Sequence, residues 1–159
     1  MDVDGVLTNG KLLYYNSDCI GRLYDSKDGM AIRLLQHNDI KIAWISGSYS
    51  QSIRKRAEDL NIEMCYTLIK NKREVLEKIQ SENNISRDQT IFLGDDINDL
   101  VVKPICKLFL CPKDSNNMIK EKADWIGKKS GGDGFVREVV DNLLSSLGVE
   151  KEHGWANIN

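Results

Sequence analysis

The sequence predicts an α/β fold built on a mostly parallel sheet with helices on both faces. Short apolar runs of strand length alternate along the chain with amphipathic segments that have helical spacing. The runs 40–45 (IKIAWI) and 90–94 (TIFLG) are almost continuously apolar, which is typical of strands buried on both faces of a parallel sheet. With 159 residues the chain can bury a core of its own. We expect one domain over 1–148 and a C-terminal tail over 149–159.

Each expected element follows from its local pattern. The runs KLLYYN (11–16) and RLYD (22–25) flank a polar turn, and they predict a β-hairpin. The other strands are expected at 40–45, 63–69, 90–94, 107–111 and 124–127, and the helices at 28–38, 50–60, 72–84, 97–104, 115–123 and 135–148. Ser50 is a candidate N-cap, and Gly148 a candidate stop signal. Because ligands in such folds bind beyond the carboxyl ends of the strands, the loops there are the places where a site is expected.

Composition excludes several classes of protein. Lys and Arg total 22 and Asp and Glu 24, so the net charge of −2 does not suit a strongly basic nucleic-acid binder. No apolar run approaches the roughly 20 residues of a membrane span. The four cysteines show no C-x-x-C spacing and no accompanying histidine cluster, so a zinc site is not expected. The chain starts at MDVDG without a basic or apolar lead, so we expect a reduced, cytoplasmic protein.

Two acidic clusters stand where chemistry would be expected. Asp2 and Asp4 lie near the start of the sequence, and Asp95, Asp96 and Asp99 come directly after the run TIFL. Carboxylates brought within a few ångströms repel one another strongly unless a cation joins them. Since only oxygen ligands are on offer, Mg²⁺ is favoured over zinc or copper. A carboxylate held beside such an ion can act as a nucleophile on phosphorus.

Three further residues complete the pattern. Ser46 and Gly47 follow the run IKIAWI, and Lys72 opens a predicted helix. A hydroxyl, a backbone amide and a lysine can hold the oxygens of a phosphoryl group. Taken alone, each feature has an ordinary interpretation: D-x-D and Ser-Gly are usually turns, and Lys72 could be a surface lysine like its neighbour Lys70. The four features occur in a fixed order: D-x-D-G-x-x-T, then strand-Ser-Gly, then Lys, then strand-G-D-D-x-x-D. A chance occurrence of all four in this order is remote.

These motifs resemble the haloacid dehalogenase superfamily of phosphatases. DVDGVLTNG, DSKDGMAIRLL and GGDGFVREV are similar to the small capless branch that acts on 3-deoxy-D-manno-octulosonate 8-phosphate and related nonulosonate 9-phosphates. The resemblance runs from Asp2 to about Leu147. It implies a Rossmann-like sheet with a small β-hairpin insertion and no cap domain. It also implies Mg²⁺ as cofactor, a sugar-acid phosphate as substrate, and a homotetramer in which neighbouring subunits close the active site.

The resemblance also implies a role for each site residue. Asp2 would be the nucleophile that forms an aspartyl-phosphate, and Asp4 would be the general acid and then the general base. The other roles would fall to Ser46 and Gly47 (phosphoryl binding), Lys72 (charge neutralisation), Asp2, Asp95 and the backbone carbonyl of Asp4 (metal), Asp96 and Asp99 (support), and Lys27 and Arg137 (substrate binding). Arg137 would reach a substrate site, possibly that of a neighbouring subunit, or lie on the solvated face of its helix; both interpretations stay open.

The sequence departs from this branch at three places. The family places an apolar strand directly before the first Asp, at the centre of the sheet, whereas only Met1 precedes Asp2 here. We therefore expect that the sequence begins late, or that something else fills the position. Ser48 stands where the branch commonly has Arg, and Asp133 where it often has a basic residue. Both changes remove positive charge near an anionic substrate, which leaves the identity of the sugar open.

Two other functions remain open at this point. The chain could be an assembly module like the phosphatase-like domain fused to acylneuraminate cytidylyltransferases, or it could run another superfamily chemistry on a different phosphate. The intact set of acidic residues, serine and lysine argues against a pure scaffold, which has no need of them.

Overall fold

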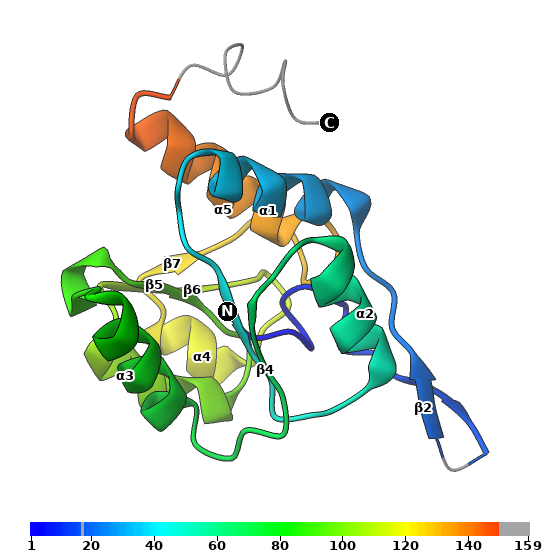
Figure 1. The fold of residues 1–159 in the computed structure, drawn as a ribbon. Helices are drawn as coiled ribbons and strands as arrows, with labels where there is room; N and C mark the ends of the chain where they lie inside the picture. The colour runs from blue at the N-terminus through cyan, green and yellow to red at the C-terminus, as the bar shows by residue number, and fades with distance from the viewer. Residues whose placement is uncertain (17, 150–159) are drawn as a thin grey trace.

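The computed structural model describes residues 1–16 and 18–149, and it confirms the predicted alternation of strands and helices (Figure 1). The elements in chain order are β1 (Leu13–Tyr15), β2 (Asp18–Gly21), α1 (Ser26–His37), β3 (Ala43–Ile45), α2 (Gln51–Asp59), β4 (Met64–Tyr66), α3 (Lys72–Asn83), η1 (Arg87–Gln89), β5 (Ile91–Leu93), η2 (Ile97–Ile105), β6 (Leu108–Cys111), α4 (Asn117–Lys122), β7 (Trp125–Ile126) and α5 (Phe135–Ser146). Helix α5 ends just before Gly148, the predicted stop, whose φ is 72°. Apart from Val149, the predicted tail 149–159 lies outside the described residues.

The sheet consists of two parallel parts. Strand β3 pairs with β4, and β5 pairs with β6, which pairs with β7. Met1 and Asp2 connect the parts. The Met1 nitrogen donates to Ala43 O (2.7 Å), Ile45 N donates to Met1 O (3.0 Å), and Asp2 N donates to Leu93 O (2.9 Å). These bonds bring the carboxyl ends of β3 and β5 to either side of Asp2.

Further from Asp2, the two parts of the sheet are separated by a cavity of about 490 Å³. Its lining includes Ala43 of β3, Ile91 of β5, Ile79 of α3 and Val139 of α5, and it is mostly apolar. Met1 and Asp2 therefore lie at the carboxyl end of the expected central position. Along the rest of the gap, no strand of the described residues pairs with both β3 and β5.

Helices cover both faces of the sheet, as predicted. Side chains of α1, α2 and α5 form one apolar core, and those of α3, η2 and α4 form the other. Figure 1 shows α1 and α5 together on one side, with α3 and α4 on the opposite side. Ser50 caps α2 by accepting a hydrogen bond from Ile53 N, which confirms its predicted role. Among the described residues, no helix combines the length and apolar character that a membrane crossing requires.

The hairpin is present, but its second strand was predicted at the wrong residues. Strand β2 is Asp18–Gly21 rather than 22–25, and it pairs antiparallel with β1. The chain turns earlier than predicted, at Asn16, whose φ of 54° suits Asn in a tight turn. Residues 22–25 instead lead back into the domain, where Tyr24 makes an isolated bridge with Thr8.

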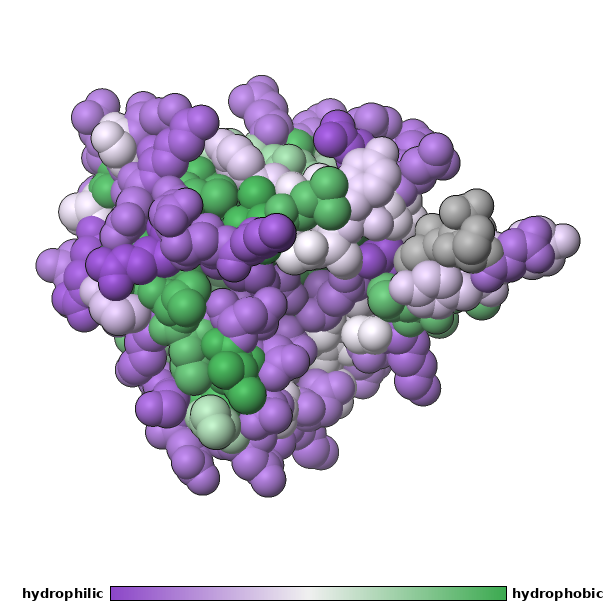
Figure 2. Space-filling model, turned by 90° about the horizontal axis from the view of Figure 1, so that it is seen from below, coloured by the Kyte–Doolittle hydropathy of each residue, from purple (hydrophilic) through white to green (hydrophobic). Residues whose placement is uncertain are grey.

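The hairpin projects from the body of the molecule in both views (Figures 1 and 2). It and its flanks expose the large apolar side chains of Leu12, Leu13, Tyr14, Tyr15 and Leu23. In the part of the chain that the structure describes, it is the largest insertion beyond the sheet and its covering helices, so there is no cap domain.

Candidate active site

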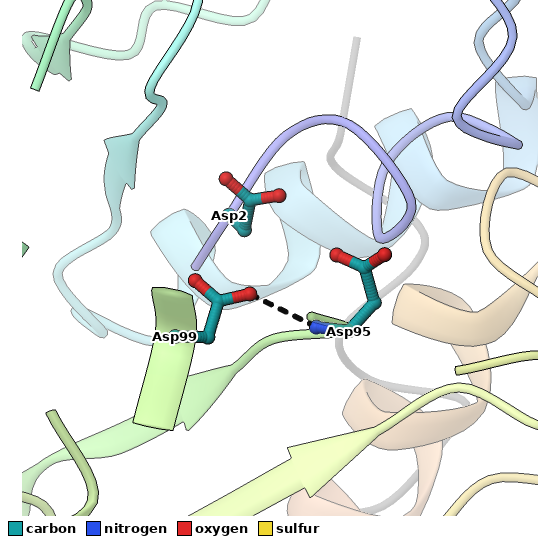
Figure 3. A group of neighbouring side chains, drawn as sticks. All are labelled: Asp2, Asp95 and Asp99. Carbon is teal, nitrogen blue, oxygen red and sulfur yellow. Dashed lines mark hydrogen bonds between the residues drawn. The ribbon is translucent and has the colours of Figure 1, made fainter. Parts of the chain in front are cut away.

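Three carboxylates converge at the carboxyl ends of β3 and β5. Asp2, Asp95 and Asp99 each offer an oxygen, and these oxygens lie within 4.8 Å of one another. Figure 3 shows the three side chains facing a common space, with Asp95 and Asp99 approaching from the segment after β5 and Asp2 from the start of the chain. Parallel strands place their carboxyl ends along one edge, which is why acids that are far apart in sequence meet here.

Lys72 connects two of these carboxylates. Its Nζ donates to Asp2 Oδ1 (2.5 Å) and to Asp99 Oδ1 (2.6 Å), and its side chain is only 2% exposed. Burial alone would lower the pKa of Lys72, but the charges of Asp2 and Asp99 outweigh burial and raise that pKa above its usual value. The lysine is therefore cationic at neutral pH. Its exposed neighbour Lys70 takes no part in the group.

Asp99 and Asp95 differ in how their oxygens are satisfied. Asp99 Oδ1 accepts from Lys72, and Oδ2 accepts from Asp95 N (3.0 Å) and Asp96 N (3.3 Å). By contrast, Asp95 Oδ1 is buried and has no hydrogen-bond partner among the described residues. An unsatisfied carboxylate oxygen beside two other carboxylates fits a hard cation such as Mg²⁺, which prefers oxygen ligands.

The electrostatics of the group agree with this interpretation. Burial, followed by the charges of Asp2 and Asp99, raises the pKa of Asp95 to about 8. Burial and the charge of Asp99 raise the pKa of Asp2 to about 6, although Lys72 opposes them. Burial and mutual repulsion together thus outweigh the single lysine, and a divalent cation would stabilise the ionised carboxylates.

Two glycines make room for these acids. A Cβ on Gly5, whose φ is 93°, would lie 2.0 Å from Asp95 Oδ2. A Cβ on Gly94 would lie 2.6 Å from the Cβ of Asp99. Any side chain at either position would displace a carboxylate, so the glycines of both acidic motifs have a steric purpose.

The Asp4 side chain points to different partners from those of Asp2. Asp4 accepts from Arg22 and from Ser48 Oγ (2.9 Å). Burial would raise the pKa of Asp4, but the hydrogen bonds and charge of Arg22 outweigh it and lower that pKa. Of the predicted metal ligands, Asp2 and Asp95 belong to the carboxylate group, whereas the Asp4 side chain does not. The role predicted for its backbone carbonyl remains a prediction.

Ser46 and Gly47 leave β3 beside the nucleophile candidate. Because Ile45 N bonds to Met1 O, the residues that follow them, Ser46 and Asp2, lie next to each other. Ser46 is buried, and its Oγ accepts from Ser48 N (3.1 Å). Gly47 is exposed, so its backbone is accessible.

The remaining predicted residues lie elsewhere. Asp96 is exposed and caps η2 by accepting from Ile97 N (2.8 Å), which supports the loop rather than the carboxylate group. Lys27 and Arg137 line a separate cavity of about 850 Å³ beside α5. Within its own helix, Arg137 pairs with Asp141 (2.9 Å). Their predicted contacts with substrate remain predictions.

The GGDG segment packs against the first acidic motif of its own chain. Gly132 N donates to Val6 O (3.1 Å). A Cβ on Gly131 would lie 1.8 Å from Gly5 O, so the two backbones are in direct contact. This segment therefore supports the loop that carries Asp2 and Asp4.

Arg22 is the residue that the sequence did not single out. Its guanidinium pairs with Asp4 although 18 residues separate them. The incorrect hairpin register placed Arg22 in a strand and hid its position. One signal in the sequence could have pointed to Arg22. Because Ser48 stands where the branch commonly has Arg, the loop that carries Asp4 needed a basic partner from another segment.

Comparisons with known proteins agree with this geometry. The sequence model of the haloacid dehalogenase-like hydrolases matches residues 68–139. A 3-deoxy-D-manno-octulosonate 8-phosphate phosphatase of Haemophilus influenzae is 32% identical over 148 residues, covering 92% of this chain and 82% of the relative. The chain belongs to the haloacid dehalogenase-like hydrolases. Within this family it falls in the capless phosphatase branch, so it is a phosphatase, and the cofactor of the family is Mg²⁺.

Solved structures of the family share the fold. The cobalt-bound octulosonate phosphatase of Haemophilus influenzae has a TM-score of 0.92 and 29% identity, and the match covers 97% of this chain and 92% of that one. The Moraxella catarrhalis phosphatase, solved with magnesium, phosphate and a KDO molecule, has a TM-score of 0.87 and 26% identity, with coverage of 91% and 83%. The metal in both of these family members is consistent with the carboxylate group described above.

Proposed function

We propose that the protein is a Mg²⁺-dependent phosphatase that hydrolyses 3-deoxy-D-manno-octulosonate 8-phosphate or a related nonulosonate 9-phosphate. The observation that carries the proposal is the buried Lys72 bonded to Asp2, opposite the unsatisfied Asp95 oxygen. A nucleophile, a fixed cation and an open metal ligand then meet at one point. The similarity to octulosonate phosphatases supports this substrate class.

In the first step, an oxygen of Asp2 attacks phosphorus and the bond from phosphorus to the sugar oxygen breaks. The protonated form of Asp4, a minor species because Arg22 lowers the pKa of the Asp4 carboxyl, gives its proton to that departing oxygen, which leaves as the sugar alcohol. Lys72 holds Asp2 in place and neutralises charge on the phosphoryl group, while Ser46 Oγ and the Gly47 N–H bind its oxygens.

In the second step, the Asp4 carboxylate removes a proton from water, and the resulting hydroxide attacks phosphorus. The bond between Asp2 and phosphorus then breaks, which restores the Asp2 carboxylate and releases phosphate. Asp2 and Asp95 would hold Mg²⁺, which supplies positive charge to the phosphoryl oxygens in both steps. Together these groups must lower the barrier by roughly 20 kcal/mol, since phosphate monoesters hydrolyse very slowly unaided.

The test is a phosphate-release assay over octulosonate, nonulosonate and sialate phosphates, together with nucleotides and phosphoglycerate, with Mg²⁺ and with EDTA. We expect turnover of at least one sugar-acid phosphate with Mg²⁺, and none with EDTA or in Asp2→Asn. Near-normal activity of Asp2→Asn would refute the nucleophile assignment. Turnover of nucleotide or phosphoglycerate substrates instead would refute the substrate class.

We further propose that the protein forms a homotetramer through its hairpins. The exposed leucines and tyrosines around β1 offer an apolar surface that a neighbouring copy could cover, and exposed apolar patches of this kind commonly mark interfaces. Light scattering should give the mass of four chains, and Tyr14→Glu should reduce it. A tetramer without turnover on any sugar phosphate would favour the assembly-module alternative.

A further inference from the structure

Leu68, on the loop after β4, has a backbone conformation that leucine rarely adopts. Its φ is 60°, in the left-handed region. Every other non-glycine residue with a positive φ in the described part of the chain is an Asn or Asp, whose short polar side chain tolerates this region. A leucine there is strained, and asparagine or glycine would fit the same backbone with less strain. The turn by itself therefore does not account for a leucine at this position.

Packing within the chain does not account for this leucine either. Leu68 is 67% exposed, and it belongs to neither of the two apolar cores. It therefore buries little apolar surface, which is the usual way in which a leucine stabilises a fold. Strained residues that the fold does not need for packing are typical of functional sites. We therefore looked for what the Leu68 side chain could contact outside the chain.

The backbone of Leu68 lies against the loop that would bind the phosphoryl group. Leu68 N donates to Ser48 O (3.4 Å), and Ile69 N donates to Ser46 O (3.0 Å). A Cβ on Gly47 would lie 3.6 Å from Ile69 O, so the two loops run side by side. Leu68 is thus one hydrogen bond away from the segment 46–48, at the carboxyl ends of β3 and β4.

A second exposed aromatic side chain borders the same segment. Tyr49 directly follows Ser48 and is 47% exposed. The guanidinium carbon of Arg54 lies 5.5 Å from the centre of the Tyr49 ring, and this cation–π contact restrains the ring. Two large side chains with apolar surface, Tyr49 and Leu68, therefore lie next to the loop that would bind the phosphoryl group. The groups that would bind the phosphoryl oxygens themselves are polar or charged.

We propose that Leu68, with Tyr49 beside it, is a specificity residue that contacts an apolar substituent on the sugar of the substrate. The inference rests on the proposed function, whose sugars differ in this respect. An octulosonate carries hydroxyl groups and a carboxylate, whereas a sialate is a nonulosonate that also carries an N-acyl group with an apolar methyl. That group is several bonds away from the phosphate, which suits a contact beside the phosphoryl-binding loop. An N-acylated nonulosonate 9-phosphate is then the preferred substrate.

The test compares two substrates that differ only at this substituent: N-acetylated sialate 9-phosphate, and the same 9-phosphate with a hydroxyl in place of the acetamido group. In the wild type we expect kcat/KM to be about tenfold higher for the N-acetylated ester. Leu68→Asn suits the left-handed backbone but removes the apolar side chain, so the preference should fall to about twofold. The loss should appear in KM with kcat little changed, because the contact is remote from the bond that breaks.

Two further variants serve as controls. Leu68→Met should keep the preference, because methionine restores an apolar side chain of similar size. Leu147→Asn is the matched control, since Leu147 is also an exposed leucine (61%) but lies at the C-terminal end of α5. It should leave both KM values unchanged. The unfolding midpoint of Leu68→Asn should not fall, because the exchange relieves strain at a site with little packing.

Four results would count against these assignments. Equal kcat/KM values for the two esters in the wild type, or a preference that Leu68→Asn leaves intact, would overturn the inference. A lower unfolding midpoint, or a lower mass of Leu68→Asn in light scattering, would assign Leu68 to the fold or to a contact between copies and overturn it too. A wild type that hydrolyses octulosonate 8-phosphate but neither nonulosonate would overturn the inference and leave the proposed function intact. A wild type that hydrolyses no sugar-acid phosphate would instead refute the proposed function.

Discussion

Two regions lie along the same gap between β3 and β5, on either side of the bonds made by Met1 and Asp2. At the carboxyl ends, Asp2, Asp95 and Lys72 form a dense polar group. Towards the amino ends, the gap is an apolar cavity of about 490 Å³. In the first region, charged side chains lie close together although the carboxylates repel one another. The second region is lined mostly by apolar side chains.

The difference shows what assembles the site. Three backbone hydrogen bonds from Met1 and Asp2 join the two parts of the sheet at the edge where the acids project. The carboxylates are held together by this backbone register and by Lys72, against their own repulsion. Along the cavity, no strand pairing of the described residues joins β3 to β5.

Removing the lysine should have the largest effect. Lys72→Met leaves Asp2 and Asp99 buried without their cation, so we expect the free energy of unfolding to fall by about 3–5 kcal/mol and kcat to fall at least about 10³-fold. Urea unfolding and steady-state kinetics measure the two effects. Lys70→Met, at an exposed position two residues earlier, should change neither.

Removing a metal ligand should raise the stability of the metal-free protein and abolish its stabilisation by Mg²⁺. Asp95→Asn takes one negative charge from a crowded group, so the metal-free protein should become about 1 kcal/mol more stable. The stabilisation by Mg²⁺, about 2.7 kcal/mol at one hundred times the dissociation constant, should disappear together with activity. Thermal unfolding with Mg²⁺ and with EDTA measures both changes, and Asp96→Asn is the control. A variant that is still stabilised by Mg²⁺ would place the metal elsewhere.

Asp28 is a buried carboxylate outside the site, and it provides a comparison with the carboxylates that would bind Mg²⁺. Asp28 on α1 accepts from Arg137 N at the start of α5 (2.8 Å), and its Oδ2 has no partner among the described residues. Burial raises the pKa of Asp28 from 3.8 to about 6, with the nearby charge of Asp25 adding to the effect and the α5 backbone opposing it.

The sign of the pH effect follows from this shift. The folded state binds the Asp28 proton more tightly than the unfolded state, so the contribution of Asp28 is largest below about pH 4 and is lost as the pH rises to about 6. Relative to Asp28→Asn, the wild type should lose about 2 kcal/mol of unfolding free energy across this window. Urea titrations at several pH values measure it. Unlike the site, this slope should be insensitive to Mg²⁺, and a difference between the two proteins that stays flat with pH would contradict the assignment.

Local patterns fixed most of the elements and the main acids. Helix periodicity and caps such as Ser50 located the helices, and apolar runs located the parallel strands. The hairpin register failed because 11–16 and 22–25 both have strand character, whereas the positive φ of Asn16 and the pairing it permits are decided in three dimensions. Arg22 was missed for this reason.

The sequence by itself determined which acids follow the buried strands, because strand ends and helix starts are local features. It named Lys72 as the site lysine but did not show that Lys72 is buried whereas Lys70 is exposed. It also could not separate the satisfied Asp99 from the unsatisfied Asp95, or pair Arg22 with Asp4. Those distinctions depend on burial and on contacts between segments far apart in the chain. Only the tertiary structure sets them, because the energy of a charge depends on which groups surround it once water is removed.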